Sequence, residues 1–215
     1  MDKAIWPYFK TKLQYIEMTK YLIGIDEAGR GPLAGPVTVG VVSVPIDFDW
    51  SLLPGVGDSK QTSPAKRELI FKQATHLREE GELNFQVVSS SHLIIDDKGI
   101  VFAIKRAMKR GLEKLQLDPR YCQVLLDGSL RAPSEFINQQ TIIKGDATEP
   151  AIGLASILAK VTRDRFMTKI AQNPELLPYD LASHKGYGTK KHCESIRQYG
   201  LSNIHRKTFC TNLLK

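Results

Sequence analysis

Residues 21–37 read YLIGIDEAGRGPLAGPV, an apolar run that leads directly into two adjacent carboxylates, Asp26 and Glu27. A glycine–arginine–glycine segment, residues 29–31, follows at once. Carboxylates at the end of a buried strand are stabilised by a cation, and oxygen ligands suit Mg²⁺ and Mn²⁺. Glycines leave room for the backbone of a substrate to come close. The stretch therefore predicts a strand that ends at a metal-dependent site.

Apolar and β-branched runs elsewhere in the chain predict the rest of a sheet. Strands are expected at residues 21–26, 36–46, 84–90, 122–127 and 141–144. Helices are expected from Ser63-Pro64 to Gly81, over about 99–115, in a long segment after Pro150, and from Thr189 to just before Gly200. Residues 173–188 are expected to be mostly loop. Strands that first run together and then alternate with helices indicate a mixed α/β sheet flanked by helices.

Two further acids occur in similar surroundings, where an apolar strand is followed by an acid with a glycine nearby. Asp127 precedes Gly128, and Asp146 follows Gly145. Ligands of open α/β sheets gather at strand ends, so acids that are far apart in the sequence can converge there. Four carboxylates in one place would repel one another and raise some of their pKa values, and bound divalent cations reverse that penalty.

Each acid taken alone has a simpler explanation. Asp127 before a glycine is typical of a turn, and Asp146 is placed to be a helix N-cap. Asp26 and Glu27 point to opposite faces of a strand, so they share a site only if the strand ends between them. Asp164 is a rival fourth ligand, but it lies between two arginines in an expected helix, where an ion pair is the simpler role. The joint occurrence of the other four acids favours the metal site.

Basic residues are concentrated in the last quarter of the chain. The formal net charge is +7, and residues 160–215 hold 11 Lys and Arg against 4 Asp and Glu, which accounts for the whole excess. A localised basic excess predicts a polyanionic partner, of which nucleic acid is the commonest. A solvated charged surface is the alternative.

The composition narrows the class of protein. A chain of 215 residues, of which 42% are hydrophobic and 25% charged, is long enough for one sizeable α/β domain. The first 20 residues lack the apolar core of a signal peptide, and no segment is apolar enough to span a bilayer. The widely spaced Cys122, Cys193 and Cys210 indicate reduced thiols in a cytoplasmic protein and do not have the spacing of a metal knuckle.

Seven motifs stand in order along the chain: GIDEAGRGPLAGPV at 24–37, DSK at 58–60, LLDG at 125–128, KGD at 144–146, ASILAKVTRDR at 155–165, HKGYGT at 184–189 and IHRKTF at 204–209. Together they resemble the type 2 ribonuclease H family, ribonuclease HII, over about residues 21–209. The resemblance implies a ribonuclease H-like fold, in which a mixed five-stranded sheet is flanked by helices and carries a helical or loop extension at its C-terminus.

The resemblance also implies roles for individual residues. The catalytic, metal-binding acids would be Asp26, Glu27, Asp127 and Asp146, with two Mg²⁺ or Mn²⁺ ions expected. The 2′-hydroxyl side of the scissile nucleotide would be contacted by Gly29, Arg30 and Gly31. Tyr187, whose ring we expect to be exposed because glycines flank it, would stack on the following sugar at the RNA-to-DNA junction. Phosphate or structural contacts are expected from Lys60, Lys160, His205 and Arg206.

The implied activity is cleavage of the RNA strand of RNA/DNA hybrids and cutting 5′ of single ribonucleotides embedded in duplex DNA, which leaves 3′-hydroxyl and 5′-phosphate ends. The expected parts are an N-terminal leader (1–20), a catalytic domain (21–172) and a basic region packed on it (173–215). We expect a cytoplasmic monomer without a membrane or an obligate protein partner. Two alternatives stay open, a DNA-acting nuclease or integrase-like enzyme on the same fold, and a non-catalytic hybrid-binding module.

Overall fold

The computed structural model describes residues 19–57 and 62–213. A five-stranded sheet has the strand order β3-β2-β1-β4-β5. Its strands are β1 (Tyr21–Ala28), β2 (Val37–Pro45), β3 (Asn84–Ser90), β4 (Cys122–Asp127) and β5 (Gln139–Ile142). The first three strands are antiparallel neighbours, whereas β4 runs parallel to β1 and β5 runs parallel to β4. The expected mixed sheet is therefore confirmed.

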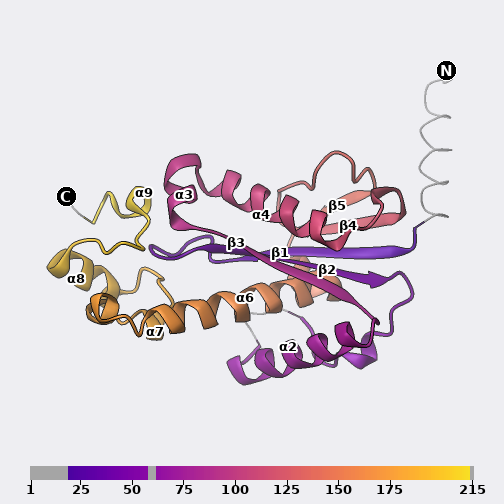
Figure 1. Ribbon diagram of the computed structural model, residues 1–215, viewed down its shortest axis with the longest axis horizontal. Coiled ribbons are helices and arrows are strands. Elements are labelled where there is room, and N and C mark those ends of the chain that lie inside the picture. The colour runs from indigo at the N-terminus through magenta and orange to yellow at the C-terminus, as the bar shows by residue number, and fades with distance from the viewer. Residues whose placement is uncertain (1–18, 58–61, 214–215) are drawn as a thin grey trace, which may run out of the picture.

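Helices cover both faces of this sheet (Figure 1). One face carries α3 (His92–Lys98) and α4 (Ile100–Leu115), and the other carries α2 (Pro64–Glu79) and α6 (Pro150–Ile170). The short helices are α5 (Gly145–Thr148), α7 (Leu181–His184), α8 (Lys190–Tyr199) and α9 (Lys207–Cys210), and 3₁₀ turns occur at Trp50–Leu52, Pro119–Tyr121 and Pro174–Tyr179. The helices α7, α8 and α9 gather beyond the C-terminal end of β1, at the left of Figure 1.

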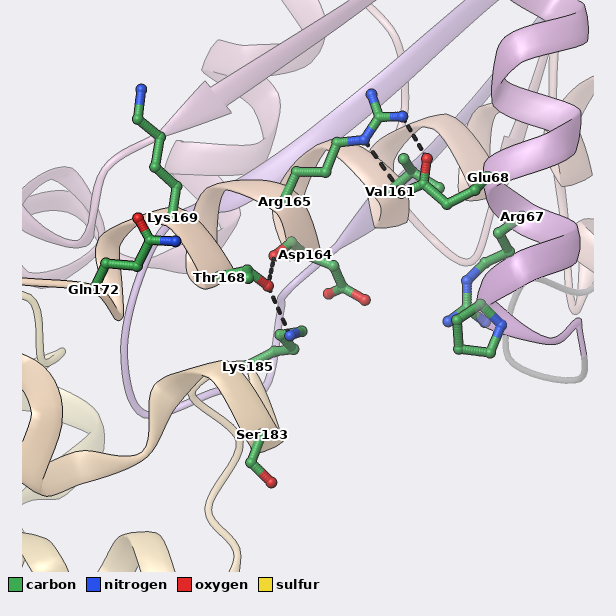
Figure 2. A pocket seen from close by; sticks show the side chains of 11 residues that line it. Arg67, Glu68, Val161, Asp164, Arg165, Thr168, Lys169, Gln172, Ser183 and Lys185 are labelled. Carbon is green, nitrogen blue, oxygen red and sulfur yellow. Dashed lines mark hydrogen bonds and ion pairs between the residues drawn. The ribbon is translucent and has the colours of Figure 1, made fainter.

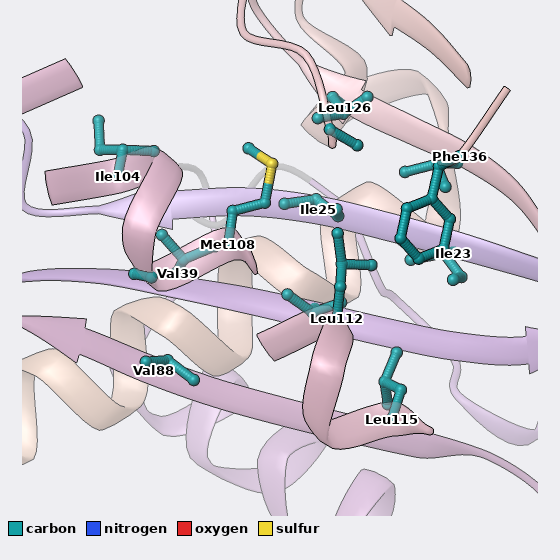
Figure 3. Close-up of a cluster of buried hydrophobic side chains, with 14 of the residues drawn as sticks. Ile23, Ile25, Val39, Val88, Ile104, Met108, Leu112, Leu115, Leu126 and Phe136 are labelled. Atoms are coloured by element: carbon teal, nitrogen blue, oxygen red, sulfur yellow. The ribbon is translucent and has the colours of Figure 1, made fainter. Parts of the chain in front are cut away.

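The core between the sheet and α4 is built from residues two apart on the strands. Ile23 and Ile25 of β1 and Val39 of β2 face Met108 and Leu112 of α4 (Figure 3). Successive strand residues point to opposite faces, so the residues between them face α6 instead. Because helices cover both faces, the two central strands are apolar almost throughout.

Two glycines let α6 lie directly on the opposite face. A Cβ atom added to Gly24 would lie 2.2 Å from the carbonyl of Ala151, and one added to Gly40 would lie 2.2 Å from the carbonyl of Ala155. Both contacts join backbone to backbone, so neither can be relieved by a side-chain rotation. This close packing fixes α6 against the sheet and brings the residues after Ala155 near the end of β1.

The C-terminal region packs against the loop that follows β1 and against the end of α6. One buried cluster contains Ala34 and Met167 together with Leu181, Ile196 and Cys210. These contacts are those expected if the basic region packs on the domain that contains the sheet. The division of the chain at residue 172 stays a prediction. The three cysteines are free, as expected.

Two of the expected strands differ in their bounds. β1 continues to Ala28, because Ala28 still pairs with Thr38 of β2. The expectation that the strand ends between Asp26 and Glu27 is therefore wrong. β5 is Gln139–Ile142 and not residues 141–144, because Ile143 is 86% exposed beyond the edge of the sheet.

Two helical regions were not expected. The segment before α4 forms a separate helix, α3, which ends where Gly99 takes a φ of 83°. Residues 173–188, expected to be mostly loop, contain a 3₁₀ turn and α7. The last helix begins as expected, since the Thr189 side chain accepts a hydrogen bond from the backbone of His192 at 3.3 Å.

Residues 1–18 of the expected leader, and Lys60, lie outside the described residues. In the part of the chain that is described, no helix combines the length and the apolar character needed to cross a membrane.

Replacing Gly40 by alanine should lower the free energy of unfolding by about 3 kcal/mol, because the new methyl group overpacks a backbone contact. Urea denaturation measures this loss. The control is Gly31→Ala, since an added Cβ there meets nothing within 4 Å. Equal stability of the two variants would contradict the proposed role of Gly40 in seating α6.

Candidate active site

Asp26 and Asp127 lie at equivalent positions on neighbouring parallel strands. The register pairs Ile25 with Leu126, which are the residues directly before them. Neighbouring strands lie about 4.8 Å apart, and side chains at equivalent positions of parallel strands point to the same face. The sheet therefore brings together two acids that are far apart in the sequence.

Asp26 is buried, with 7% of its surface exposed. Its carboxylate accepts a hydrogen bond from the backbone N–H of Glu27 at 2.7 Å, and it also interacts with the hydroxyl of Ser156 on α6. Burial is the main cause that raises the pKa of Asp26 to about 7, and the negative charges of Glu27 and Asp127 add to it, while the hydrogen bonds from Ser156 and Glu27 act in the opposite direction. Two of the three other expected carboxylates therefore act on Asp26 through their charge.

Glu27 is paired with the arginine of the glycine–arginine–glycine segment. Arg30 donates a hydrogen bond from Nη1 to the Glu27 carboxylate at 3.1 Å, and the two side chains are 49% and 17% exposed. Because β1 continues past Glu27, this side chain starts from the face opposite to Asp26. Its charge nevertheless raises the pKa of Asp26, so the two carboxylates lie within electrostatic range.

Asp146 is connected to Asp127 through the backbone. The N–H of Gly145 donates a hydrogen bond to the Asp127 carboxylate at 2.8 Å, and Asp146 is the next residue, only 6% exposed. Asp146 is not an N-cap, because Lys144 caps α5 and Glu149 caps α6. Asp127 therefore binds the backbone of the segment that carries Asp146, a contact that its alternative role as a turn residue does not require.

No three His, Cys, Asp or Glu side chains within residues 19–57 and 62–213 are grouped closely enough to hold a metal ion. Glu27 is instead turned to Arg30, and Asp127 to the N–H of Gly145. The chemistry of the predicted donors nevertheless fits a divalent cation, because all four are carboxylates. The raised pKa of Asp26 reports a site where added positive charge would be favourable.

The buried Arg206 side chain binds the backbone carbonyls of the glycine–arginine–glycine segment. Its guanidinium donates hydrogen bonds to the carbonyls of Gly29 at 2.7 Å, Arg30 at 3.0 Å and Gly35 at 2.9 Å. The N–H of a trans peptide points opposite to its carbonyl, so the N–H groups of Arg30 and Gly31 point away from Arg206. A side chain at Gly31 would meet open space. The segment thus turns its carbonyls inward and leaves peptide N–H groups to face outward.

Arg163 of α6 supports the same loop from a second side. It donates from Nε to the carbonyl of Pro36 at 2.9 Å and from Nη2 to the carbonyl of Ala34 at 3.1 Å. Gly29 has a φ of 89°, and a Cβ added there would lie 2.0 Å from Arg163 Nε. Glycine is therefore required at position 29 both by its conformation and by its neighbour.

Tyr187 lies over the basic face of α6. Its surface is 41% exposed, as expected from its flanking glycines. The ring centroid is 5.5 Å from Lys160 Nζ and 5.7 Å from Arg163 Cζ, which are cation–π distances. The ring is therefore positioned by two cations and still open to a partner.

Two of the expected phosphate or structural contacts are structural. His205 is 2% exposed and Arg206 is 0% exposed, so their side chains cannot touch a duplex in this structure. Of the two expected roles, phosphate contact and structural contact, the burial of these two residues supports the structural one. The third, Lys160, is partly exposed beside Tyr187 and stays a predicted substrate contact. Lys60 lies outside the described residues.

Asp164 forms an ion pair, as the simpler explanation required, but its partner is Lys160 one helical turn earlier, at 2.8 Å, and not a neighbouring arginine. It follows Ser156, which contacts Asp26, by two turns of α6, or about 12 Å along the helix. It is therefore not placed to be a fourth ligand beside Asp26.

A pocket of about 650 Å³ lies between α2, the second half of α6 and α7 (Figure 2). None of the four predicted metal ligands lines it. Two charge pairs involve its lining residues, Arg165 with Glu68 and Asp164 with Lys160, and Lys185 donates to the hydroxyl of Thr168. The pocket is therefore separate from the predicted metal ligands.

The supporting roles of Ser156 and Arg163 were missed from the sequence. Both lie in the motif at 155–165, and they are seven residues apart, so they fall on one face of the helix. That spacing is a weak signal, because it does not reveal which strand or loop the face will meet.

Comparison with known proteins gives consistent results. Residues 23–212 match the family model described as Ribonuclease HII. A protein of Endomicrobium trichonymphae named Ribonuclease HII is 44% identical over 186 residues, which cover 86% of this chain and 83% of that protein. These matches confirm the resemblance carried by the sequence motifs.

Solved structures share the fold. Ribonuclease H2 from Pyrococcus horikoshii OT3 is similar with a TM-score of 0.65 and 25% identity, covering 90% of this chain and 96% of that one. Bst-RNase HIII, solved in complex with Mn²⁺, gives a TM-score of 0.65 at 17% identity, with coverage of 94% and 72%. The second likeness shows the fold alone.

Replacing Asp26 by asparagine should stabilise the metal-free protein at about pH 8. The pKa of Asp26 is raised from 3.8 to about 7 on folding, so the folded state binds this proton more tightly than the unfolded state. The stability that the group contributes is present below pH 3.8 and is lost as the pH rises to about 7. Above that pH the free energy of unfolding of the wild type is lower than at low pH by up to about 4 kcal/mol because of this one group. Asparagine does not titrate, so the variant does not undergo this loss.

Chemical denaturation in EDTA at about pH 5 and about pH 8 checks this prediction. The stability gain of Asp26→Asn over the wild type should grow between the two pH values. Asp97→Asn, which neutralises an exposed carboxylate on α3, is the control and should show no such growth. A gain from Asp26→Asn that is independent of pH would contradict the prediction.

Proposed function

This chain belongs to the ribonuclease HII family, whose members are endoribonucleases, and from that premise we propose that it cuts the RNA strand of RNA/DNA hybrids and cuts 5′ of single ribonucleotides embedded in duplex DNA. The observation that carries the proposal is the meeting of Asp26 and Asp127 at equivalent positions of neighbouring parallel strands, directly after the last residue pair that joins β1 to β4. The carboxyl ends of parallel strands, here the end of β4, are where α/β sheets bind ligands.

The proposed metal ligands are Asp26, Glu27, Asp127 and Asp146. When bound, two Mg²⁺ or Mn²⁺ ions would supply an activated water and charge stabilisation for in-line hydrolysis, giving 3′-hydroxyl and 5′-phosphate ends. Three features support the assignment: the carboxylate donors, the raised pKa of Asp26, and the Mn²⁺ present in the structurally similar Bst-RNase HIII. Within the protein, Ser156 and the N–H of Glu27 orient Asp26, and the N–H of Gly145 orients Asp127.

Recognition of the ribonucleotide is assigned to the outward face of the glycine–arginine–glycine segment. Its carbonyls are occupied by Arg206, so the N–H groups of Arg30 and Gly31 are the backbone donors that a ribose 2′-hydroxyl could meet. The absence of a side chain at Gly31 allows that approach. Arg30 is half-exposed and would exchange its bond to Glu27 for a phosphate contact when Glu27 binds a cation.

Tyr187 is proposed to stack on the sugar that follows the ribonucleotide. The exposed ring lies next to Lys160, so an aromatic face and a cation are presented together. Exposed basic residues of α6 and α8 would follow the phosphate backbone, whereas Arg163 and Arg206 are committed to the loop and do not contribute to that surface. Binding of this kind carries little sequence information.

The first experiment compares three substrates with the wild-type protein: an all-DNA duplex, the same duplex with one ribonucleotide, and an RNA/DNA hybrid. With Mg²⁺ or Mn²⁺ we expect cleavage of the last two, with the single-ribonucleotide duplex cut on the 5′ side of the ribonucleotide, and no cleavage in EDTA. Equal cutting of the all-DNA duplex would identify a DNA-acting nuclease instead. Binding of the hybrid without cleavage in either metal would identify a binding module.

The second experiment tests the metal ligands. Asp127→Asn should lower kcat by at least about 100-fold, because an amide replaces an anionic ligand, while hybrid affinity changes less than about threefold. Gel-shift and single-turnover assays measure the two quantities. Asp97→Asn, an exposed substitution on α3, is the matched control and should cut like the wild type. Near-normal turnover by Asp127→Asn would sink the metal assignment.

A further inference from the structure

Three histidines form a cluster beneath the loop that carries Tyr187. His192 of α8 is 0% exposed and His205 is 2% exposed. The rings of His184 and His192 stack with centroids 4.3 Å apart, and the Nε2 atoms of His192 and His205 are 3.0 Å apart. None of these side chains has a part in the chemistry proposed above, so the cluster calls for another explanation.

The hydrogen bonds determine the tautomer of both buried rings. The backbone N–H of Ser202 can only donate, and it lies 2.9 Å from His205 Nδ1, which must therefore accept. The proton of neutral His205 is then on Nε2, which donates to His192 Nε2 at 3.0 Å. His192 consequently carries its proton on Nδ1, which donates to the carbonyl of Tyr187 at 2.9 Å. One ordered chain of bonds thus runs from Ser202 to Tyr187.

This chain requires both rings to be neutral. A second proton on either ring would place two donors against each other, at Ser202 or between the two Nε2 atoms. Burial, together with the charge of the neighbouring histidines, lowers the pKa of His192 and of His205 to about 4. Other titratable groups near the pair are His184, stacked on His192, Tyr179, whose ring centroid is 4.9 Å from that of His205, and His92, whose charge acts on His205.

The bonds end on a loop that is also held by the N–H of Leu33, which donates to the carbonyl of Gly186 at 2.8 Å, and by the two cations against the Tyr187 ring. The Tyr187 carbonyl also accepts from the N–H of Thr189 at 2.8 Å, and the Tyr187 N–H donates to the carbonyl of His184 at 3.0 Å. Just before it, the N–H of Gly186 donates to His184 Nδ1 at 3.2 Å. The hydrogen bond from His192 Nδ1 to the Tyr187 carbonyl connects the backbone of this loop to a side chain of α8.

We propose that His192, with its tautomer set by His205, is a positioning residue that holds the Tyr187 peptide so that the tyrosine ring faces the RNA-to-DNA junction. The proposal rests on the proposed substrate role of Tyr187. His192 does not touch substrate itself, because it is fully buried. It acts through its hydrogen bond to the carbonyl of Tyr187.

Two amide substitutions separate the two bonds of His192. Asparagine places its amide near the position of Nδ1 and can still donate to Tyr187, whereas glutamine reaches the position of Nε2 and meets His205 instead. On a duplex with one ribonucleotide, His192→Gln should raise KM about tenfold, the effect of one lost hydrogen bond, with kcat changed less than about twofold. His192→Asn should stay within about threefold of the wild-type KM. A loss of folded protein would instead lower kcat and leave KM unchanged.

A double-mutant cycle tests whether the effect passes through the tyrosine. Tyr187→Ala alone should raise KM, and adding His192→Gln to it should change KM by less than about twofold. A full extra rise in the double variant, or equal KM values for the asparagine and glutamine variants, would overturn the proposal. So would an unchanged KM for Tyr187→Ala. In that case the proposed function survives if the wild type still cuts the ribonucleotide duplex and spares all-DNA, so the two failures are distinguishable.

The tautomers can be measured without any substitution. Long-range ¹⁵N–¹H correlation spectra of the wild-type protein at about pH 7 should show His192 protonated on Nδ1 and His205 protonated on Nε2. Glu194→Gln, an exposed change on the same helix, serves as the control in the kinetic series. The reverse tautomer on either ring would break the chain of bonds and overturn the proposal.

Discussion

Two buried guanidinium groups, those of Arg163 and Arg206, fix the loop on which the proposed recognition depends. Between them they donate to five carbonyls within residues 29–36. A buried charge is costly unless it is hydrogen-bonded, and loop carbonyls away from water need donors, so each group satisfies the other. Burial, and then the charge of Arg163, lower the pKa of Arg206. Within the described residues, Nη1 of Arg163 is buried without a hydrogen-bond partner, so this guanidinium is satisfied only in part.

The long helix α6 connects this loop to the acids. Its close contact with β1 and β2 leaves no freedom for the helix to shift. From that fixed position Ser156, Lys160 and Arg163 fall on one face at successive turns, and they reach Asp26, the Tyr187 ring and the loop in that order. The acids, the recognition segment and the exposed ring are therefore positioned by one rigid element, and movement of α6 would disturb all three together.

Charge is divided between the two sides of this arrangement. Carboxylates meet where the pairing of β1 with β4 ends, and there burial and mutual repulsion raise the pKa of Asp26 to about 7. The basic excess surrounds them on α6 and the C-terminal helices, and the buried histidines between those helices have their pKa values lowered to about 4. The proposed metal site beside basic helices would suit a polyanion that is held and then hydrolysed.

The sequence by itself determined the order of the sheet-forming segments, the long helix after Pro150, the caps at Ser63 and Thr189, and the family, because apolar periodicity, capping residues and ordered motifs are local signals. It predicted which acids to consider. Only the tertiary structure decided that β1 runs past Glu27, that Arg206 and His205 are buried, and that Ser156 meets Asp26. Burial and partnership depend on which distant segments pack together. An arginine looks the same in the sequence whether it contacts a phosphate or, like Arg206, donates to three buried loop carbonyls. Its role is therefore set by its neighbours in space.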